Sequence, residues 1–307
     1  MNWQDDQKGL RDRLFQLLGV DAGGASFAGV QSRGVQDCHG WCLEDLLFQG
    51  ANGEDIPAFF LRPPRGHAKV PALIYAHAHG NNYAVGRDEL IAGRPALQGP
   101  YAADLVARGV AVLCIEMPCF GARQQPNESS RSKALAWHGK TLFGQMLDEQ
   151  RAGIEFLSQH SAVDADRIGT LGFSMGSTLA WWLAALDPRI RATSALCSFA
   201  DLETLVGTGA HDGHGPYMTV PGLLPVARSG QIAGLAAPRA LHIGGGLLDW
   251  STPAVAFEIG RSDLEAGYAA AGAQEKLSFF VDPQSGHVET PEMRAAALDF
   301  LRRELLD

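Results

Sequence analysis

From about residue 72 onward, short apolar runs alternate with helical patterns, and this alternation limits the fold more than any other feature of the chain. Each apolar run has the length of a strand that is covered by helices on both sheet faces. Such alternation predicts a mostly parallel sheet with crossover helices. The predicted strands cover residues 72–77, 110–117, 167–173, 192–198, 239–243 and 277–281, and the predicted helices cover residues 101–108, 141–159, 175–186, 253–271 and 291–306.

The remaining segments extend this pattern without suggesting a second domain. A helical pattern predicts an N-terminal helix at about residues 5–18, and residues 41–48 and 56–61 read as antiparallel strands joined by the turn Asn52-Gly53. Glycines and prolines crowd residues 200–235, which follow the sixth predicted strand. A segment of this length is more often a cap over an active site than a structureless loop. We expect residues 1–307 to form a single α/β domain with a short cap.

The charge and cysteine content exclude several classes of function. The chain has 307 residues and a formal net charge of −9, which disfavours nucleic acid and anionic membranes as partners. No apolar run approaches the ~20 residues of a transmembrane helix, and the polar, acidic start is unlike a signal peptide. The five cysteines are an odd number without zinc-like spacing, so we expect reduced thiols in a cytoplasmic protein.

The sequence Gly172-Phe173-Ser174-Met175-Gly176 lies where a predicted strand ends and a helix begins. A serine flanked in this way on a strand-to-helix turn is typical of a nucleophile elbow, which exposes the hydroxyl above the sheet. Glycines are needed because a Cβ at either position would collide with the neighbouring strand or helix. The amide of Met175, the first of the helix, could stabilise an oxyanion.

A serine nucleophile needs a base, and the base needs an orienting acid. His287 is the best placed of the ten histidines, because it follows the last predicted strand and precedes the last helix. Asp249, Asp201 and Asp282 are candidate acids. Asp201 is explained as a helix cap and Asp282 as a turn residue before proline, so the chain order Ser, Asp, His favours Asp249.

The loop after residues 72–77 is expected to supply the second oxyanion donor, the amide of Asn81, with Asn82 as the alternative. The candidate substrate pocket comes from this loop, other strand ends and the cap. Its members are His79, Glu116, His211, His214, Tyr217 and Trp250. Packing or loop roles are the simpler explanation for each of them, and we expect Glu116 to pair with Arg123.

These residues together resemble the α/β-hydrolase superfamily, and within it the dienelactone-hydrolase-like and acetyl-xylan-esterase-like branch. The likeness runs from about residue 40 to the end, through His79-Gly80, the elbow, Gly245 to Asp249, and Gly286-His287. It implies an α/β-hydrolase fold and a cofactor-free hydrolase with Ser174 as nucleophile, His287 as base and Asp249 as acid. Dienelactone hydrolases carry cysteine at the elbow, so their substrate is not implied.

The expected reaction is hydrolysis of a small-molecule carboxylic ester, such as a small acyl ester or an acetylated substrate, through an acyl-enzyme. A lactonase or a peptidase could use the same residues. A non-catalytic ligand-binding protein on this fold is the alternative of a different class. A metal-dependent hydrolase using His77, His79, His211 and His214 is a further alternative, but no acidic ligand lies at a recognisable spacing. The sequence does not indicate the oligomeric state.

Overall fold

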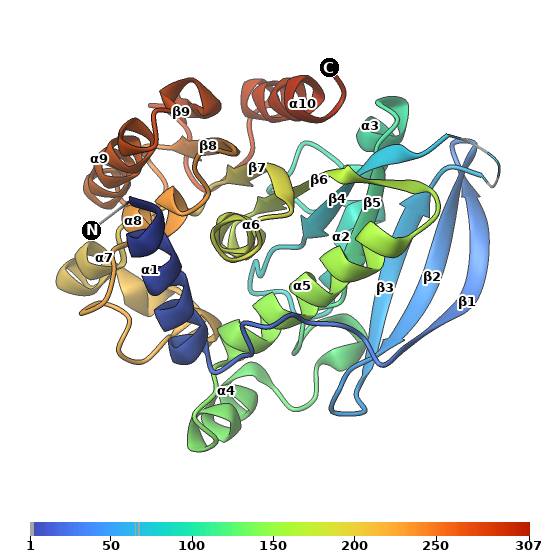
Figure 1. Ribbon diagram of the computed structural model, residues 1–307, viewed down its shortest axis with the longest axis horizontal. Coiled ribbons are helices and arrows are strands. Elements are labelled where there is room, and N and C mark those ends of the chain that lie inside the picture. Colours follow the sequence, from blue (N-terminus) through green and yellow to red (C-terminus); the bar gives the residue numbers. More distant parts are fainter. Residues whose placement is uncertain (1–2, 65, 67) are drawn as a thin grey trace.

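Figure 1 shows the computed structural model of the chain, which describes residues 3–64, 66 and 68–307. A single sheet of nine strands crosses the described part of the chain, in the order β1-β2-β3-β5-β4-β6-β7-β8-β9. The strands are β1 (Gly29–Cys38), β2 (Trp41–Gln49), β3 (Asp55–Arg62), β4 (Val70–Ala76), β5 (Ala111–Ile115), β6 (Val163–Phe173), β7 (Ile190–Leu196), β8 (Ala240–Gly246) and β9 (Leu277–Asp282).

Helices cover both faces of the sheet (Figure 1). One apolar cluster joins the sheet to α1, α5, α6, α8 and α9, and a second joins it to α2, α3 and α10. The α-helices are α1 (Trp3–Leu18), α2 (Glu89–Ala92), α3 (Ala102–Ala107), α4 (Glu128–Trp137), α5 (Leu142–Gln159), α6 (Met175–Leu186), α7 (Leu202–Thr208), α8 (Ser229–Gly234), α9 (Ala254–Ala270) and α10 (Pro291–Leu305). Short 3-10 turns are η1 (Gly86–Asp88), η2 (Gly121–Arg123), η3 (Ala210–Gly213), η4 (Pro216–Met218) and η5 (Gln274–Lys276).

The strand directions bring the candidate residues to one edge of the sheet. Strands β5, β4, β6, β7, β8 and β9 pair in parallel, whereas β1, β2, β3 and β5 pair in antiparallel fashion. The carboxyl ends of parallel strands therefore lie together, as in other open α/β sheets. Ser174 follows β6, Asp249 follows β8 and His287 follows β9. The predicted α/β fold with a mostly parallel sheet is confirmed.

The helix α6 shows why the alternation in the sequence was informative. All twelve of its residues are buried, and it packs against β6 and β7. A helix that is apolar on every side must lie inside the molecule. The predicted hairpin is also confirmed, since Gln49 pairs with Asp55 across a turn in which Gly53 has a φ of 79°.

The sequence predicted neither strand β1 nor the helices α2, α4 and α8. Strand β1 lies at the sheet edge and eight of its ten residues are exposed, so it carries no apolar alternation. Because β1 precedes all the predicted strands, the cap segment (residues 200–235) follows the seventh strand, β7, and not the sixth. Helix α4 was also missed, because few of its residues are apolar and only Glu128 and Arg131 are buried.

Candidate active site

The elbow positions Ser174 through local backbone strain. Strand β6 ends at Phe173, α6 begins at Met175, and Ser174 between them has a φ of 57° and a ψ of −121°. A non-glycine residue at positive φ costs of order 1–3 kcal/mol and is retained where the surrounding structure requires it. A Cβ on Gly176 would overlap the carbonyl oxygen of Ala76, and one on Gly172 would overlap the backbone of Gly176. Both glycines are therefore required sterically.

The structure brings Ser174, His287 and Asp249 together in a line. Nε2 of His287 lies 2.9 Å from the Ser174 hydroxyl oxygen, and its Nδ1 lies 2.8 Å from Oδ2 of Asp249. The Asp249 side chain is 1% exposed and the His287 side chain 17%. A buried carboxylate beside Nδ1 holds the proton there, which leaves Nε2 free to accept the proton of the serine.

The two other candidate acids make different contacts. Asp201 is the N-cap of α7, where its side chain accepts a hydrogen bond from the amide of Thr204 at 3.0 Å. Asp282 accepts from the amide of Gln284 at 2.8 Å in the turn after β9. Each therefore has the local role that its sequence context suggested.

Ser251 is a member of the site that sequence reasoning missed. Its hydroxyl donates to Oδ1 of Asp249 at 2.8 Å and lies 2.9 Å from Nδ1 of His287. Its backbone amide donates to the same Asp249 oxygen at 2.8 Å. Because the Ser251 hydroxyl donates its proton to Asp249, the Ser251 oxygen is left to accept a hydrogen bond from Nδ1–H of His287. The only sequence signal for this role was the position of Ser251, two residues after Asp249 and directly before Thr252-Pro253, where a helix begins.

The predicted oxyanion donors lie in the first turn of α6 and in the loop after β4. The Met175 amide belongs to the helical turn whose N–H groups have no intrahelical acceptor. The Asn81 amide donates to Nδ1 of His79 at 3.1 Å, and the Asn82 amide donates to the His79 carbonyl at 3.1 Å. The Asn81 amide can therefore donate to an oxyanion only if its N–H is shared between the oxyanion and Nδ1 of His79, or if its hydrogen bond to His79 is broken.

A buried acid beneath this loop fixes the ring of His79. Nε2 of His79 lies 3.0 Å from Glu128, which also accepts from the Tyr83 hydroxyl at 2.5 Å and the Tyr217 amide at 2.8 Å. Burial favours a higher pKa for Glu128, but the hydrogen bonds from His79 and Tyr83 outweigh it and lower the pKa. Because Asn81 donates to Nδ1, the His79 proton is on Nε2. His79 and Tyr217 therefore support the loop from below.

Glu116 has a structural role different from the one expected. Its carboxylate accepts from the amides of Arg87 at 2.8 Å and Ala122 at 3.1 Å, and burial raises its pKa. The guanidinium of Arg123 donates to the backbone carbonyl of Glu116 and forms ion pairs with Glu54 and Glu149. The predicted Glu116–Arg123 side-chain pair is therefore wrong, because two other carboxylates occupy that guanidinium.

The loops after β8 and β9 contribute an apolar rim beside His287. Trp250 is 58% exposed, and its ring centroid lies 5.7 Å from that of His287. Leu248 and Val288 are also exposed. Nε2 of His214 contacts the carbonyl of Ser251 at 2.8 Å, so the cap reaches the loop after β8 that carries Asp249. His211 is exposed and lies against the Leu205 carbonyl at 3.4 Å.

The histidines proposed as metal ligands have other partners. Nε2 of His77 accepts from the Met117 amide at 3.1 Å, while His79 contacts Glu128 and His214 contacts a carbonyl. In residues 3–64, 66 and 68–307 no three His, Cys, Asp or Glu side chains are grouped as a metal site. Among the helices in these residue ranges, none is long and apolar enough to cross a membrane.

The sequence is similar to those of known proteins. Residues 38–205 match the family model described as acetyl xylan esterase (AXE1). YtaP of Bacillus subtilis (strain 168), assigned as a hydrolase, is 35% identical over 96% of this chain and 98% of its own. A protein of Bradyrhizobium sp assigned as a 2-oxo-3-(5-oxofuran-2-ylidene)propanoate lactonase is 29% identical over 65% of this chain and 68% of its own.

The fold has solved counterparts. Acetyl xylan esterase 1 from Thermoanaerobacterium sp. JW/SL YS485 superposes with a TM-score of 0.64 at 18% identity, over 98% of this chain and 94% of that one. At this identity the likeness concerns the fold alone. With the family match, it confirms the resemblance to the α/β-hydrolase superfamily and to its acetyl-xylan-esterase-like branch.

Proposed function

Because the chain belongs to the acetyl xylan esterase family and is a carboxylic-ester hydrolase, we propose that it acts through Ser174, His287 and Asp249 by way of an acyl-enzyme. The observation that carries the proposal is the continuous chain of contacts from the Ser174 hydroxyl through His287 to Asp249, at 2.9 and 2.8 Å. This is the geometry that lets imidazole act first as base and then as acid.

In the first half-reaction, Oγ of Ser174 attacks the ester carbonyl while Nε2 of His287 takes the hydroxyl proton. The buried carboxylate of Asp249 stabilises the imidazolium that forms. The amides of Met175 and Asn81 donate to the oxyanion, and loss of one such donor typically raises the barrier by ~3 kcal/mol. His287 then returns the proton to the departing alcohol, which leaves Ser174 acylated.

In the second half-reaction, His287 accepts a proton from water, which attacks the acyl group. The tetrahedral intermediate collapses, the acid is released, and the proton returns to the Oγ of Ser174. All bonds are made and broken by the serine, the imidazole and water, so the proposed reaction uses no cofactor.

The proposed substrates are small carboxylic esters, including acetylated compounds of the kind that the family is named for. A lactone is the second candidate, because a relative assigned as a lactonase is 29% identical over 201 residues. Opening a lactone needs the same attack and the same proton transfers, with the alcohol remaining attached to the acyl group. The apolar rim of Leu248, Trp250 and Val288 is the proposed contact for the group beside the scissile bond.

A panel of substrates tests this proposal. Purified protein is assayed on p-nitrophenyl acetate and butyrate, on acetylated sugars and on a five-membered lactone, with Ser174→Ala as the control for each. We expect hydrolysis of at least the acetyl ester by the native protein and none by the variant. A folded native protein without turnover on any member would contradict the proposal and favour a ligand-binding role.

A further inference from the structure

A buried carboxylate holds the base loop (residues 283–290) in place. Glu289 lies two residues after His287, and its side chain is fully buried. That side chain accepts from the Gln98 amide at 2.8 Å, from Nη1 of Arg294 at 2.9 Å and from the Tyr101 hydroxyl. Its backbone takes part as well, since its amide donates to the Ala96 carbonyl and its carbonyl accepts from the Gln98 side chain. The position of His287 therefore depends on residues 96–101.

A second buried carboxylate holds the oxyanion loop (residues 77–82) in a matching way. Glu89 is fully buried and accepts from the Ala78 amide at 3.0 Å and the Tyr75 hydroxyl at 2.7 Å. The guanidinium of Arg94 pairs with Glu89 and also donates to the Ala78 carbonyl at 2.9 Å. Both backbone groups of Ala78 are thus fixed by one Glu–Arg pair.

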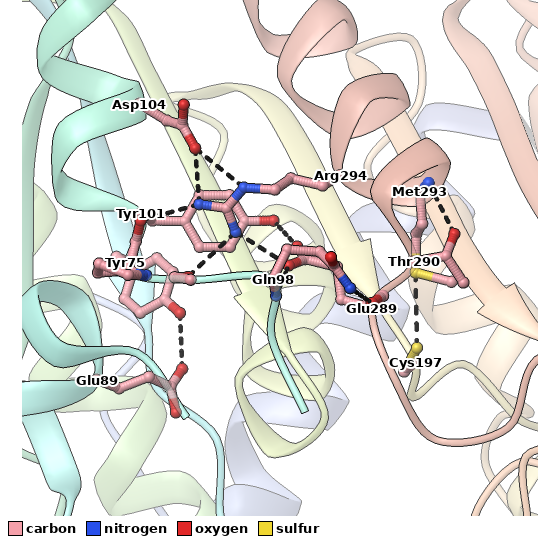
Figure 2. A network of polar contacts seen from close by, with 12 residues as sticks. Tyr75, Glu89, Gln98, Tyr101, Asp104, Cys197, Glu289, Thr290, Met293 and Arg294 are labelled. Carbon is pink, nitrogen blue, oxygen red and sulfur yellow. Dashed lines mark hydrogen bonds and ion pairs between the residues drawn. The ribbon is translucent and has the colours of Figure 1, made fainter. Parts of the chain in front are cut away.

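The two clusters share one piece of chain, the support segment (residues 89–101). Its first part supplies Glu89 and Arg94 to the oxyanion loop, and its last part supplies Gln98 and Tyr101 to the base loop. Figure 2 shows the two carboxylates on either side of Tyr75 and Tyr101. The centroids of these two rings lie 5.5 Å apart, so the clusters are also in contact through their tyrosines.

We propose that the support segment positions both loops of the active site, through Glu289 on one side and Glu89 on the other, and so sets the distance between His287 and the oxyanion donor Asn81. These residues do not reach the reacting atoms, so they are positioning residues. Burying two charged clusters is a poor way to gain stability, since apolar residues in the same space are often as stable or more so. A fixed geometry is what directional hydrogen bonds add to packing.

The inference rests on the proposed esterase function, and its test separates the two. The variants Tyr101→Phe and Tyr75→Phe each remove one hydroxyl, from the Glu289 and Glu89 cluster respectively, and leave the packing nearly unchanged. Tyr268→Phe is the matched control. Tyr268 is equally buried and donates one hydrogen bond, to the Arg239 carbonyl at 2.7 Å. Arg239 directly precedes β8, so this contact lies at the amino end of the strand, away from the active site at the carboxyl ends.

Steady-state kinetics on p-nitrophenyl acetate and the melting temperature are measured for the native protein and the three tyrosine variants, and Ser174→Ala is assayed beside them. We expect the three variants to lose similar thermal stability. Tyr101→Phe and Tyr75→Phe are expected to lower kcat by about tenfold with KM within about twofold, because small misplacements of catalytic groups cost rate more than binding. The kcat of Tyr268→Phe should equal that of the native protein.

Equal kcat values for all three variants would overturn the inference, since the hydroxyls would then contribute only to stability. A loss confined to Tyr101→Phe or to Tyr75→Phe would overturn the shared role of the segment. If instead the native protein and Ser174→Ala hydrolyse the ester at the same rate, the proposed function itself has failed.

Discussion

The hydroxyl of Ser251 lies 2.9 Å from Nδ1 of His287 and donates to Asp249, so it belongs to the acid–base pair that it adjoins. Nδ1–H therefore faces two oxygens, Oδ2 of Asp249 and Oγ of Ser251. The aspartate supplies the charge and sets the tautomer, whereas the serine shares the proton and holds the carboxylate in place. The two residues should consequently differ in their effect on turnover.

Replacing Asp249 by Asn is expected to lower kcat by about 10⁴-fold, because an amide no longer selects the tautomer with its proton on Nδ1. Replacing Ser251 by Ala should cost only about tenfold, the worth of one hydrogen bond to a charged group. Ser285→Ala is the control. Ser285 lies in the base loop with His287, and its buried hydroxyl has no hydrogen-bond partner among the described residues. Equal kcat values for the two serine variants would remove Ser251 from the site.

Gly176→Ala should destabilise the protein by at least about 3 kcal/mol, because the added Cβ would overlap the backbone of β4 at Ala76. A Cβ added to Gly207 in α7 would meet no atom within 4 Å, so Gly207→Ala should be neutral or stabilising. Urea unfolding of both variants measures the difference. Equal stabilities would show that the elbow is not sterically confined.

The stability of the fold should fall at mildly acidic pH because of His77. This imidazole is fully buried, and burial lowers its pKa to about 3. Its pKa in the unfolded chain is ~6.5, so between these values the unfolded state binds more protons. Above pH ~6.5 the titration of His77 leaves the free energy of unfolding unchanged. As the pH drops below ~6.5, the free energy of unfolding falls by up to ~1.4 kcal/mol per pH unit.

Urea unfolding at pH 7.5 and 5.5 tests this for the native protein and for His77→Gln, which keeps an acceptor for the Met117 amide. The variant should lose less stability between the two pH values. It retains part of the slope, since burial also lowers the pKa of His242, to about 4. Identical slopes would show that His77 is not responsible.

Ester hydrolysis should persist in excess EDTA, because the proposed mechanism moves protons only through Ser174, His287 and water. The measurement is the rate on p-nitrophenyl acetate before and after overnight dialysis against the chelator. Inactivation that zinc or manganese reverses would support a metal-dependent reaction instead.

Most of the fold, and the residues Ser174, Asp249 and His287, could be predicted from the sequence because their signals lie in short stretches of the chain. Short buried strands and the largely apolar, fully buried α6 leave a local signal in the sequence, and the elbow is defined by five consecutive residues around Ser174. Several of the missed contacts join residues that are far apart in the sequence. Glu289 looks like a surface loop residue, yet the Tyr101 hydroxyl that binds it comes from 188 positions away. The carboxylates that occupy Arg123 are likewise far from it in sequence.

The most direct test of the account is the reaction of Ser174 itself. A fluorophosphonate probe is added to the native protein and to Ser174→Ala, the labelled peptide is identified by mass, and p-nitrophenyl acetate hydrolysis is measured in parallel. The account predicts a label on Ser174, and loss of both label and turnover in the variant, with kcat lowered by up to ~10⁶-fold. Label on another residue, or turnover by Ser174→Ala at a rate comparable to the native protein, would contradict it.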